Sequence, residues 1–379
     1  MRVVELRPLE AGRLDRAKAS YTTRRVPIGT AKALVTGVAP RPGDVLLARV
    51  IEIGQHSFVE SGVGRRATIF PGDEVVVCYG SRYAPDQFEA EVPPVVSTCH
   101  LVAGGGIAAT VLSWHQAMRP PTVIEPVGLL ADEDGRRLNL ANCALPPLAT
   151  CWPRPFTLAV VGTSMNAGKT TGAANAARGL LASGLPTGAG KVTGTGAGKD
   201  LWLMRDAGAR PVLDFTDAGF PSTYRVTPQA IEGILQTLLG HLRAADVAAI
   251  VLEIADGLYQ PETASLVASR AFADSVDAVL FAASDAMGAA AGVAWLRERG
   301  LNVVAVTGVL TASPLAIREA EHATRLPVLT PAALATDALL RHLGIATRRA
   351  VVSAVQESEP AVFVSAPARS TSPELATAR

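Results

Sequence analysis

The segment FTLAVVGTSMNAGKTT, residues 156–171, joins an apolar run to a glycine-bounded polar loop. The apolar run is typical of a buried β-strand, and the small-residue stretch TGAANAARGLLASG beyond the loop is typical of a helix that ends at Gly184. A loop between a strand and a helix can hold phosphate groups with its backbone N–H groups and the helix N-terminus. The segment therefore predicts a phosphate-binding loop.

The closing triplet of this loop, Gly168-Lys169-Thr170, carries its chemistry. The lysine would neutralise phosphate charge, and the hydroxyl of Thr170 would ligate magnesium. Gly162 lies one position earlier than the pattern GxxxxGK[ST] requires, so the loop is a lengthened form. The predicted nucleotide-binding residues are Gly162, Thr163, Asn166, Ala167, Gly168, Lys169, Thr170 and Thr171.

A parallel α/β domain is expected around the loop. Apolar runs at residues 157–162, 248–254, 277–283 and 302–307 alternate with helical patterns. One of these patterns begins at Thr227, a helix cap followed by a proline in the first turn. Alternation of this kind implies a P-loop-type parallel sheet with helices on both faces.

The first part of the chain has a different rhythm. Short β-branched runs follow Pro-Gly-Asp turns in PGDVLLARVIEIG and PGDEVVVCYG, and Asp134-Gly135 marks a hairpin. This pattern predicts a smaller β-rich domain, such as a partly open barrel with one helix. The predicted parts are the β-rich domain at residues 1–148, a proline-rich linker at 149–156, the phosphate-loop domain at 157–352 and a disordered tail at 353–379.

Two segments of the β-rich part have alternative interpretations. CHLVAGGGIAATVLSWHQ resembles a strand, three glycines and a helical segment, so residues 104–106 either bind an anion or form a tight turn. The polar segment YGSRYAPDQFEA is either a solvated loop or a substrate-contacting loop over the active site. Its polar side chains include Arg82, Tyr83, Asp86 and Glu89.

The charge balance indicates no polyanionic partner, and the expected partner is a small-molecule substrate. The 379 residues include 35 basic and 34 acidic side chains, a net charge of +1, so neither nucleic acid nor an anionic membrane is expected as a partner. Residues 276–296 are weakly polar but contain Asp277 and Asp285, which favours a buried strand and a helix over a bilayer span.

The cysteines and the N-terminus indicate a reducing compartment. The charged N-terminal segment lacks the apolar core of a signal peptide, which predicts a cytoplasmic protein. The cysteines lack metal-ligand spacing and are expected to be buried free thiols. They are Cys78, Cys99, Cys143 and Cys151.

The form GTxxxxGKTT, with Thr163 after the first glycine, resembles the loop of dethiobiotin synthetase and the cobyrinic acid amide synthases, which are ATP-using enzymes. The resemblance covers residues 157–331 and extends to a poorly characterised P-loop family that includes N-acetyltransferases acting on a D-amino acid. Related partitioning and septum-placement ATPases carry a second lysine early in the loop, where this chain has Thr163 and Ser164. A dimerising ATPase switch of that type is therefore disfavoured.

A second lysine follows the first helix. In dethiobiotin synthetase-like enzymes a Lys-Pro-Val segment ends the second strand, and its lysine reaches the transferring phosphoryl group and the substrate. Lys191-Val192-Thr193-Gly194 is similar, which implies that role for Lys191. The glycines of TGTGAGK independently indicate either a close approach of backbone to ligand or a flexible turn. Lys199 and Asp200 contribute to the site or are solvated.

Two acids end apolar runs. Asp214 and Glu253 each stand at the carboxyl end of an expected strand, where ligand sites of open α/β sheets form. Glu253 also resembles the glutamate after the corresponding strand of dethiobiotin synthetase, whereas Asp256 is explained equally well as a helix cap. Magnesium on a triphosphate takes one hydroxyl and one or two carboxylates from the protein. The predicted magnesium ligands are Thr170, Asp214 and Glu253.

These residues predict an ATP- and Mg²⁺-dependent, ligase-like enzyme that phosphorylates a small-molecule carboxylate for C–N bond formation. Arg225 would suit a substrate carboxylate or the charge of the transferring phosphoryl group, or is solvated. The predicted catalytic residues are Lys169, Lys191 and Arg225. ATP is expected because the guanine-reading motif NKxD is absent after residues 302–307.

Two alternative functions stay open at this point. An N-acyltransferase could use the phosphate loop to cradle the diphosphate of acetyl-CoA, and a non-catalytic nucleotide switch or metallochaperone could dock its partner on the β-rich domain. The resemblance also implies a homodimer, because active sites of the resembled synthetases lie near a subunit boundary.

Overall fold

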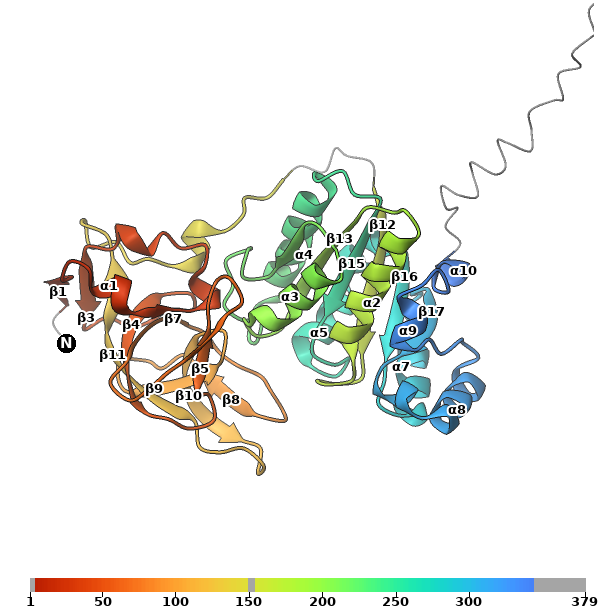
Figure 1. Cartoon of the computed structure of the whole chain (residues 1–379), viewed down its shortest axis with the longest axis horizontal. Coiled ribbons are helices and arrows are strands. Elements are labelled where there is room, and N and C mark those ends of the chain that lie inside the picture. Colours follow the sequence, from red (N-terminus) through yellow and green to blue (C-terminus); the bar gives the residue numbers. More distant parts are fainter. Residues whose placement is uncertain (1–3, 149–153, 344–379) are drawn as a thin grey trace, which may run out of the picture. The chain divides into compact units, whose positions relative to one another are not determined.

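The computed structural model describes residues 4–148 and 154–343 (Figure 1). The predicted tail at 353–379, most of the predicted linker at 149–156, and Cys151 lie outside the described residues.

The regular secondary structure of the first part of the chain consists mostly of strands. Its helical turns are short: α1 (Arg13–Arg16) and the 3-10 turns η1 (Tyr21–Thr23), η2 (Ile28–Thr30) and η3 (Leu140–Cys143). Its strands are β1 (Glu5–Pro8), β2 (Lys18–Ala19), β3 (Ala33–Thr36), β4 (Val45–Glu52), β5 (Phe58–Glu60), β6 (Arg66–Thr68), β7 (Glu74–Tyr79), β8 (Phe88–Glu91), β9 (Cys99–Ala103), β10 (Ile107–Trp114) and β11 (Thr122–Ala131).

Five of these strands close into a barrel. The order β11, β4, β7, β10 returns to β11 because β9 pairs with both β10 and β11. Along β4, Leu46 and Ala48 pack in one apolar cluster while Val45 and Leu47 pack in another, so this strand is covered on both faces. The predicted β-rich domain is confirmed, with a barrel that closes where a partly open one was expected.

The prediction of a helix after residues 104–106 is wrong, because residues 107–114 form strand β10. β9 and β10 form an antiparallel hairpin, with Ile107 opposite Ala103 and Ala109 opposite His100. β10 also pairs with β7 and β8, so its backbone groups are satisfied by strands distant in sequence. Gly106 supports the turn with φ of 96°, a value that favours glycine.

The second part is an α/β domain. Its strands are β12 (Phe156–Gly162), β13 (Thr187–Thr193), β14 (Val212–Asp214), β15 (Ala249–Ile254), β16 (Ala278–Ala282) and β17 (Val303–Thr307). Its helices are α2 (Lys169–Ala182), α3 (Gly198–Asp206), α4 (Pro228–Arg243), α5 (Pro261–Val267), α6 (Arg270–Ser275), α7 (Ala286–Arg297), η4 (Val309–Ala312), α8 (Pro314–Thr324), α9 (Pro331–Leu334) and α10 (Leu340–Leu343).

The six strands of this domain form one parallel sheet in the order β14-β13-β15-β12-β16-β17. Residues Ala159 and Val161 of β12 pack with α4 to α8 on one face, and Leu158 and Val160 pack with α2, α3, α9 and α10 on the other. The predicted parallel sheet with helices on both faces is confirmed. β12 lies between β15 and β16, so its carboxyl end is flanked by two others.

Local signals identified several elements correctly. The side chain of Thr227 accepts a hydrogen bond from the backbone N–H of Ala230 at 3.4 Å and caps α4. The weakly polar stretch 276–296 is strand β16 followed by helix α7. Within the described residues, no helix is long and apolar enough to cross a membrane. Cys78 and Cys99 are buried free thiols as expected, while Cys143 is a half-buried one.

Candidate functional site

The predicted phosphate loop joins β12 to α2, and close backbone contacts fix its shape. A Cβ atom on Gly162 would lie 2.8 Å from the carbonyl oxygen of Ala282, and one on Gly168 would lie 2.9 Å from the Cα of Gly308. Gly168 also has φ of 99°, a left-handed value at the start of α2. Glycine is therefore required at both ends of the loop, which is pinned against the ends of β16 and β17.

The first two residues of α2 bring the reactive side chains into the loop. Lys169 is buried, and its Nζ donates a hydrogen bond to the carbonyl oxygen of Ser164 at 2.7 Å. Burial lowers the pKa of Lys169, and the carboxyl groups of Glu253 and Asp256 oppose that shift. Thr170 Oγ1 donates to Glu253 Oε1 at 2.9 Å. The helix N-terminus, a lysine and a hydroxyl thus meet where phosphate oxygens are expected.

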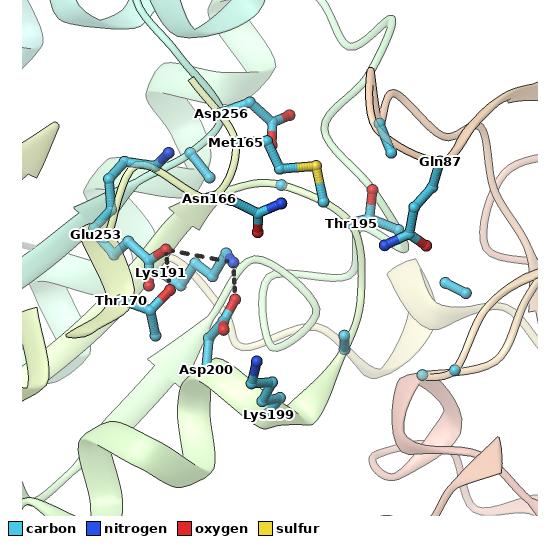
Figure 2. Close-up of a pocket in the computed structure, with 18 of the residues that line it drawn as sticks. Gln87, Met165, Asn166, Thr170, Lys191, Thr195, Lys199, Asp200, Glu253 and Asp256 are labelled. Atoms are coloured by element: carbon cyan, nitrogen blue, oxygen red, sulfur yellow. Dashed lines mark hydrogen bonds and ion pairs between the residues drawn. The ribbon is translucent and has the colours of Figure 1, made fainter. Parts of the chain in front are cut away.

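A cluster of opposite charges lies beside Thr170 (Figure 2). Lys191 on β13 is opposite Glu253 on β15, with its Nζ 3.6 Å from Glu253 Oε1, and it also donates to Asp200 Oδ2 of α3. Burial alone would lower the pKa of Lys191, but the carboxylates of Asp200 and Glu253 raise it above its usual value. Lys191 is therefore held as a cation.

Glu253 has an unsatisfied oxygen. Its side chain is buried, and Oε2 has no hydrogen-bond partner among the described residues. Burial raises the pKa of Glu253, while Lys191 and Lys169 act in the opposite direction. A buried carboxylate oxygen without a partner is costly, and a cation or a proton removes that cost.

Asp200 and Asp256 are site residues that sequence reasoning did not assign. Asp200 accepts a hydrogen bond from Lys191; burial alone would raise its pKa, but Lys191, Lys199 and Thr170 together lower it below its usual value. Asp256 follows β15 and lines the same cavity, with a pKa raised by burial. The sequence feature that could have identified Asp200 is its position directly after TGTGAGK. In the structure this position lies in the first turn of α3.

Asp214 lies apart from this cluster. Its buried carboxylate accepts a hydrogen bond from the Tyr21 hydroxyl at 2.5 Å, forms an ion pair with Arg24 at 3.2 Å, and accepts from the Thr216 hydroxyl. These contacts come largely from the β-rich part and occupy both carboxylate oxygens. The prediction that Asp214 ligates magnesium is untested. These contacts do not favour it, because they already occupy both oxygens that would bind the metal.

Arg225 also lies outside the cavity lining. Its guanidinium is exposed and pairs with Glu91 of β8 at 2.6 Å, and its backbone N–H donates to Glu262 at 2.6 Å. Because the side chain is solvated and already paired, a catalytic role for Arg225 stays a prediction without support from its surroundings.

One cavity of about 450 Å³ connects the phosphate loop to the β-rich part. It is lined from the α/β side by Lys169, Lys191 and Glu253, and from the β-rich side by groups that include Arg82 and Gly105. The predicted site residues that line it are Asn166, Gly168, Lys169, Thr170, Thr171, Lys191 and Glu253. The others, Gly162, Thr163, Ala167, Asp214 and Arg225, are not among its lining residues.

No known family model matches the sequence, and no curated protein matches it. Solved structures that it is similar to include the signal recognition particle receptor FtsY from Elizabethkingia anophelis, at 16% identity over 48% of this chain and 60% of that one, with a TM-score of 0.32. Chloroplast FtsY from Physcomitrella patens has 17% identity over 50% and 62%, with a TM-score of 0.33. The signal recognition particle 54 kDa protein from Aeropyrum pernix K1, in complex with GDP, has 17% identity over 54% and 49%, with a TM-score of 0.35.

The chain covers less than two thirds of the length of each of these structures. These identities and TM-scores are too low to support a fold assignment. The fold is therefore assigned from the strand order and the loop geometry of this chain.

Proposed function

We propose that the protein is an ATP- and Mg²⁺-dependent enzyme that phosphorylates a small-molecule carboxylate and transfers the acyl group to a nitrogen nucleophile. The observation that carries this proposal is the shared cavity: a phosphate loop, a second lysine and polar groups from the β-rich part line one space of about 450 Å³. Such a space can hold a second substrate beside the phosphates.

The chain's own groups suit phosphoryl transfer. Lys169 and the loop N–H groups would hold the β- and γ-phosphates of ATP. Lys191, kept cationic by its carboxylate neighbours, would exchange Asp200 for the oxygens of the transferring phosphoryl group. Chemistry of this type depends on positioning and charge stabilisation, so the protein need not supply a nucleophile.

Magnesium fits the residues present. Thr170 Oγ1 and the unpartnered Oε2 of Glu253 would hold it, with phosphate oxygens and water completing its oxygen ligands. Among the described residues, no group of three or more His, Cys, Asp or Glu side chains is placed to bind a metal. Bound magnesium would neutralise the negative charge that builds up on the phosphate oxygens.

The proposed reaction balances in two steps. A carboxylate oxygen attacks the γ-phosphorus, the bond to the bridging oxygen breaks, and ADP leaves, which gives an acyl phosphate. The nitrogen nucleophile then attacks the acyl carbon, phosphate leaves with the electron pair of the C–O bond, and the nitrogen loses a proton to solvent.

Hydroxylamine trapping tests this proposal. Purified protein is incubated with ATP, Mg²⁺, hydroxylamine and a panel of carboxylic acids, and ADP and hydroxamate are both measured. We expect one class of acid to stimulate both products, and the Lys169→Ala variant to form neither.

Two other results would replace the proposal. Nucleotide binding or hydrolysis that no carboxylate stimulates would favour a switch. Tight binding of acetyl-CoA with no binding of ATP would favour an acyltransferase.

A further inference from the structure

The β-rich part places a buried arginine at the cavity. Arg82 follows β7, and its backbone is fixed by two hydrogen bonds with Ala90, at 2.8 and 3.0 Å. The residue is only 6% exposed, yet Arg82 is among the residues that line the cavity containing Lys169 and Glu253. The guanidinium is therefore enclosed by protein and borders the substrate space.

The groups in direct contact with this guanidinium are neutral. Nη2 donates to Gln87 Oε1 at 2.8 Å, Nη1 lies 3.0 Å from His56 Nε2, and the guanidinium carbon lies over the Phe88 ring, 6.0 Å from its centroid. Its Nε has no hydrogen-bond partner among the described residues. Burial lowers the pKa of His56 to about 3, with the charge of Arg82 adding to that shift, so the imidazole is neutral.

Acids are near Arg82 but none pairs with it. Asp86 directs its Oδ2 to Asn166 of the phosphate loop, and Asp256 lies near Lys169 and Lys191 as well as near Arg82. In the described part of the chain, Arg82 forms no ion pair with either acid. Burial lowers the pKa of Arg82 to about 10, with Asp86 and Asp256 acting against it.

A buried cation without an anionic partner is energetically unfavourable. Removing a charge from water is unfavourable unless an opposite charge compensates it. A guanidinium is suited to oxyanions because its planar N–H groups match two oxygens at once. Gln87, which accepts a hydrogen bond from Nη2, lies across the pocket from Lys191 and Glu253 (Figure 2). Arg82 lines the same cavity as the phosphate loop.

We propose that Arg82, positioned by Gln87 and His56, binds a second oxyanionic group of the acceptor substrate, a carboxylate or a phosphate that is not the group being phosphorylated. The acceptor is then a small dianion, with one end at the phosphate loop and the other at Arg82. This inference rests on the proposed function for the role of the acceptor, but the anion subsite itself can be measured without turnover.

Calorimetry with the full chain tests the subsite. The probes are succinate, glutarate and adipate, the monocarboxylates butyrate, pentanoate and hexanoate as partners of similar length, and 3-phosphonopropionate. Each is titrated with and without Mg²⁺ and a non-hydrolysable ATP analogue. We expect at least one dianion to bind about 30-fold or more tightly than its monoanionic partner, the effect of one desolvated charge pair. A preference for the phosphonate would identify phosphate as the second group.

Variants decide whether Arg82 carries the preference. Arg82→Gln should abolish the preference for dianions, and Arg82→Lys should retain part of it. The ATP affinity of both variants should change less than about twofold, because Arg82 does not contact the phosphate loop. Arg49→Gln is the matched control, because Arg49 is half exposed and pairs with Glu74 at 3.3 Å outside the cavity. A melting temperature for each variant reports its folding.

The outcomes separate this inference from the proposed function. Equal binding of dianions and monoanions, no binding of any probe, or an Arg82→Gln variant that keeps the preference would each overturn the subsite. A preference that depends on Arg82 without hydroxamate formation would support the subsite and remove the ligase-like reaction.

Discussion

Glu253 contacts both Thr170 of the phosphate loop and Lys191 of the neighbouring strand β13. It accepts the Thr170 hydroxyl, lies 3.6 Å from Lys191 and keeps one buried oxygen without a partner in the described structure. The same side chain can therefore receive magnesium and balance the charge of Lys191. Lys191 would in turn be released toward the nucleotide when a metal takes over that carboxylate.

Replacing Glu253 by glutamine should separate metal binding from nucleotide binding. Glu253→Gln keeps the shape of the side chain but removes its charge. We expect the factor by which Mg²⁺ increases ATP affinity to be about tenfold or more smaller in this variant than in the wild type, by analogy with the loss of groups that support a metal site. Calorimetric titration of ATP with and without Mg²⁺ measures this. An unchanged magnesium effect would show that Glu253 is not a ligand.

Asp214 should contribute stability through its ion pair. Burial alone would raise the pKa of Asp214, but Arg24 and the hydroxyls of Thr216 and Tyr21 lower it below its usual value. We expect Asp214→Asn to lower the free energy of unfolding by about 3–5 kcal/mol at pH 7, the cost of breaking a buried pair. Because the folded-state pKa is lowered, that difference should persist above about pH 5 and shrink as the pH falls below about 4.

Denaturant unfolding from pH 7 to pH 3 checks this dependence. Asp246→Asn is the control, because Asp246 is exposed and has φ of 53°, which asparagine tolerates. A difference between Asp214→Asn and the wild type that grew on acidification would contradict the assigned pKa direction.

At the scale of elements, the loop after β15 supports the phosphate loop from the side. A Cβ atom on Gly257 would lie 2.3 Å from the Thr163 carbonyl oxygen and 2.8 Å from the Ser164 Cα. The two loops are therefore in backbone contact, and the shape of one depends on the other. The same close approach recurs at Gly105, whose Cβ would meet the Gly196 carbonyl oxygen at 2.0 Å.

Gly257→Ala should displace the phosphate loop without unfolding the domain. The added methyl group forces Thr163 and Ser164 to shift, so we expect ATP affinity to fall about tenfold or more, as misplaced binding groups lose their alignment. Gly233→Ala is the matched control, because Gly233 lies in α4 and a methyl group added there would meet nothing within 4 Å. That control should bind ATP normally and gain up to about 1 kcal/mol of stability. Normal ATP affinity in Gly257→Ala would show that the contact is adaptable.

At the scale of the molecule, a buried polar cluster links the β-rich part to the sheet. Arg24 stacks on the Tyr21 ring at 4.1 Å and pairs with Asp217 at 2.7 Å, while the Tyr21 hydroxyl binds Asp214 at the end of β14. A further contact is made by Glu60, which accepts the backbone N–H of Gly198 at 2.7 Å at the start of α3. The two parts therefore share satisfied polar groups that neither could satisfy alone.

This linkage predicts cooperative unfolding. We expect the wild type to unfold in one calorimetric transition, and the Tyr21→Phe, Arg24→Ala double variant to show two, because it removes the buried contacts that join the parts. Arg16→Ala is the control, since its pair with Glu10 at 3.2 Å is solvated on both sides. A single transition in the double variant would mean that other contacts suffice for coupling.

The sequence by itself determined the phosphate loop and the sheet around it. Strand, glycine loop and helix are local signals, and buried parallel strands are marked by continuous apolar runs, so both could be identified from short windows. Lys169, Thr170 and Glu253, which line one cavity, could be selected from the sequence for this reason: each has a fixed place relative to a strand end or a helix start. Their roles stay predictions.

Only the tertiary structure decided which side chains meet. The hairpin at residues 104–106 depends on β7, β8 and β11, the partner of Asp214 is an arginine 190 residues away, and the exposure of Arg225 follows from packing. Arg82 was visible as a polar residue in a segment with two interpretations, but its burial without an acidic partner is a property of the folded barrel against the α/β domain. Pairings between distant segments depend on the sum of many weak contacts, which no local pattern encodes.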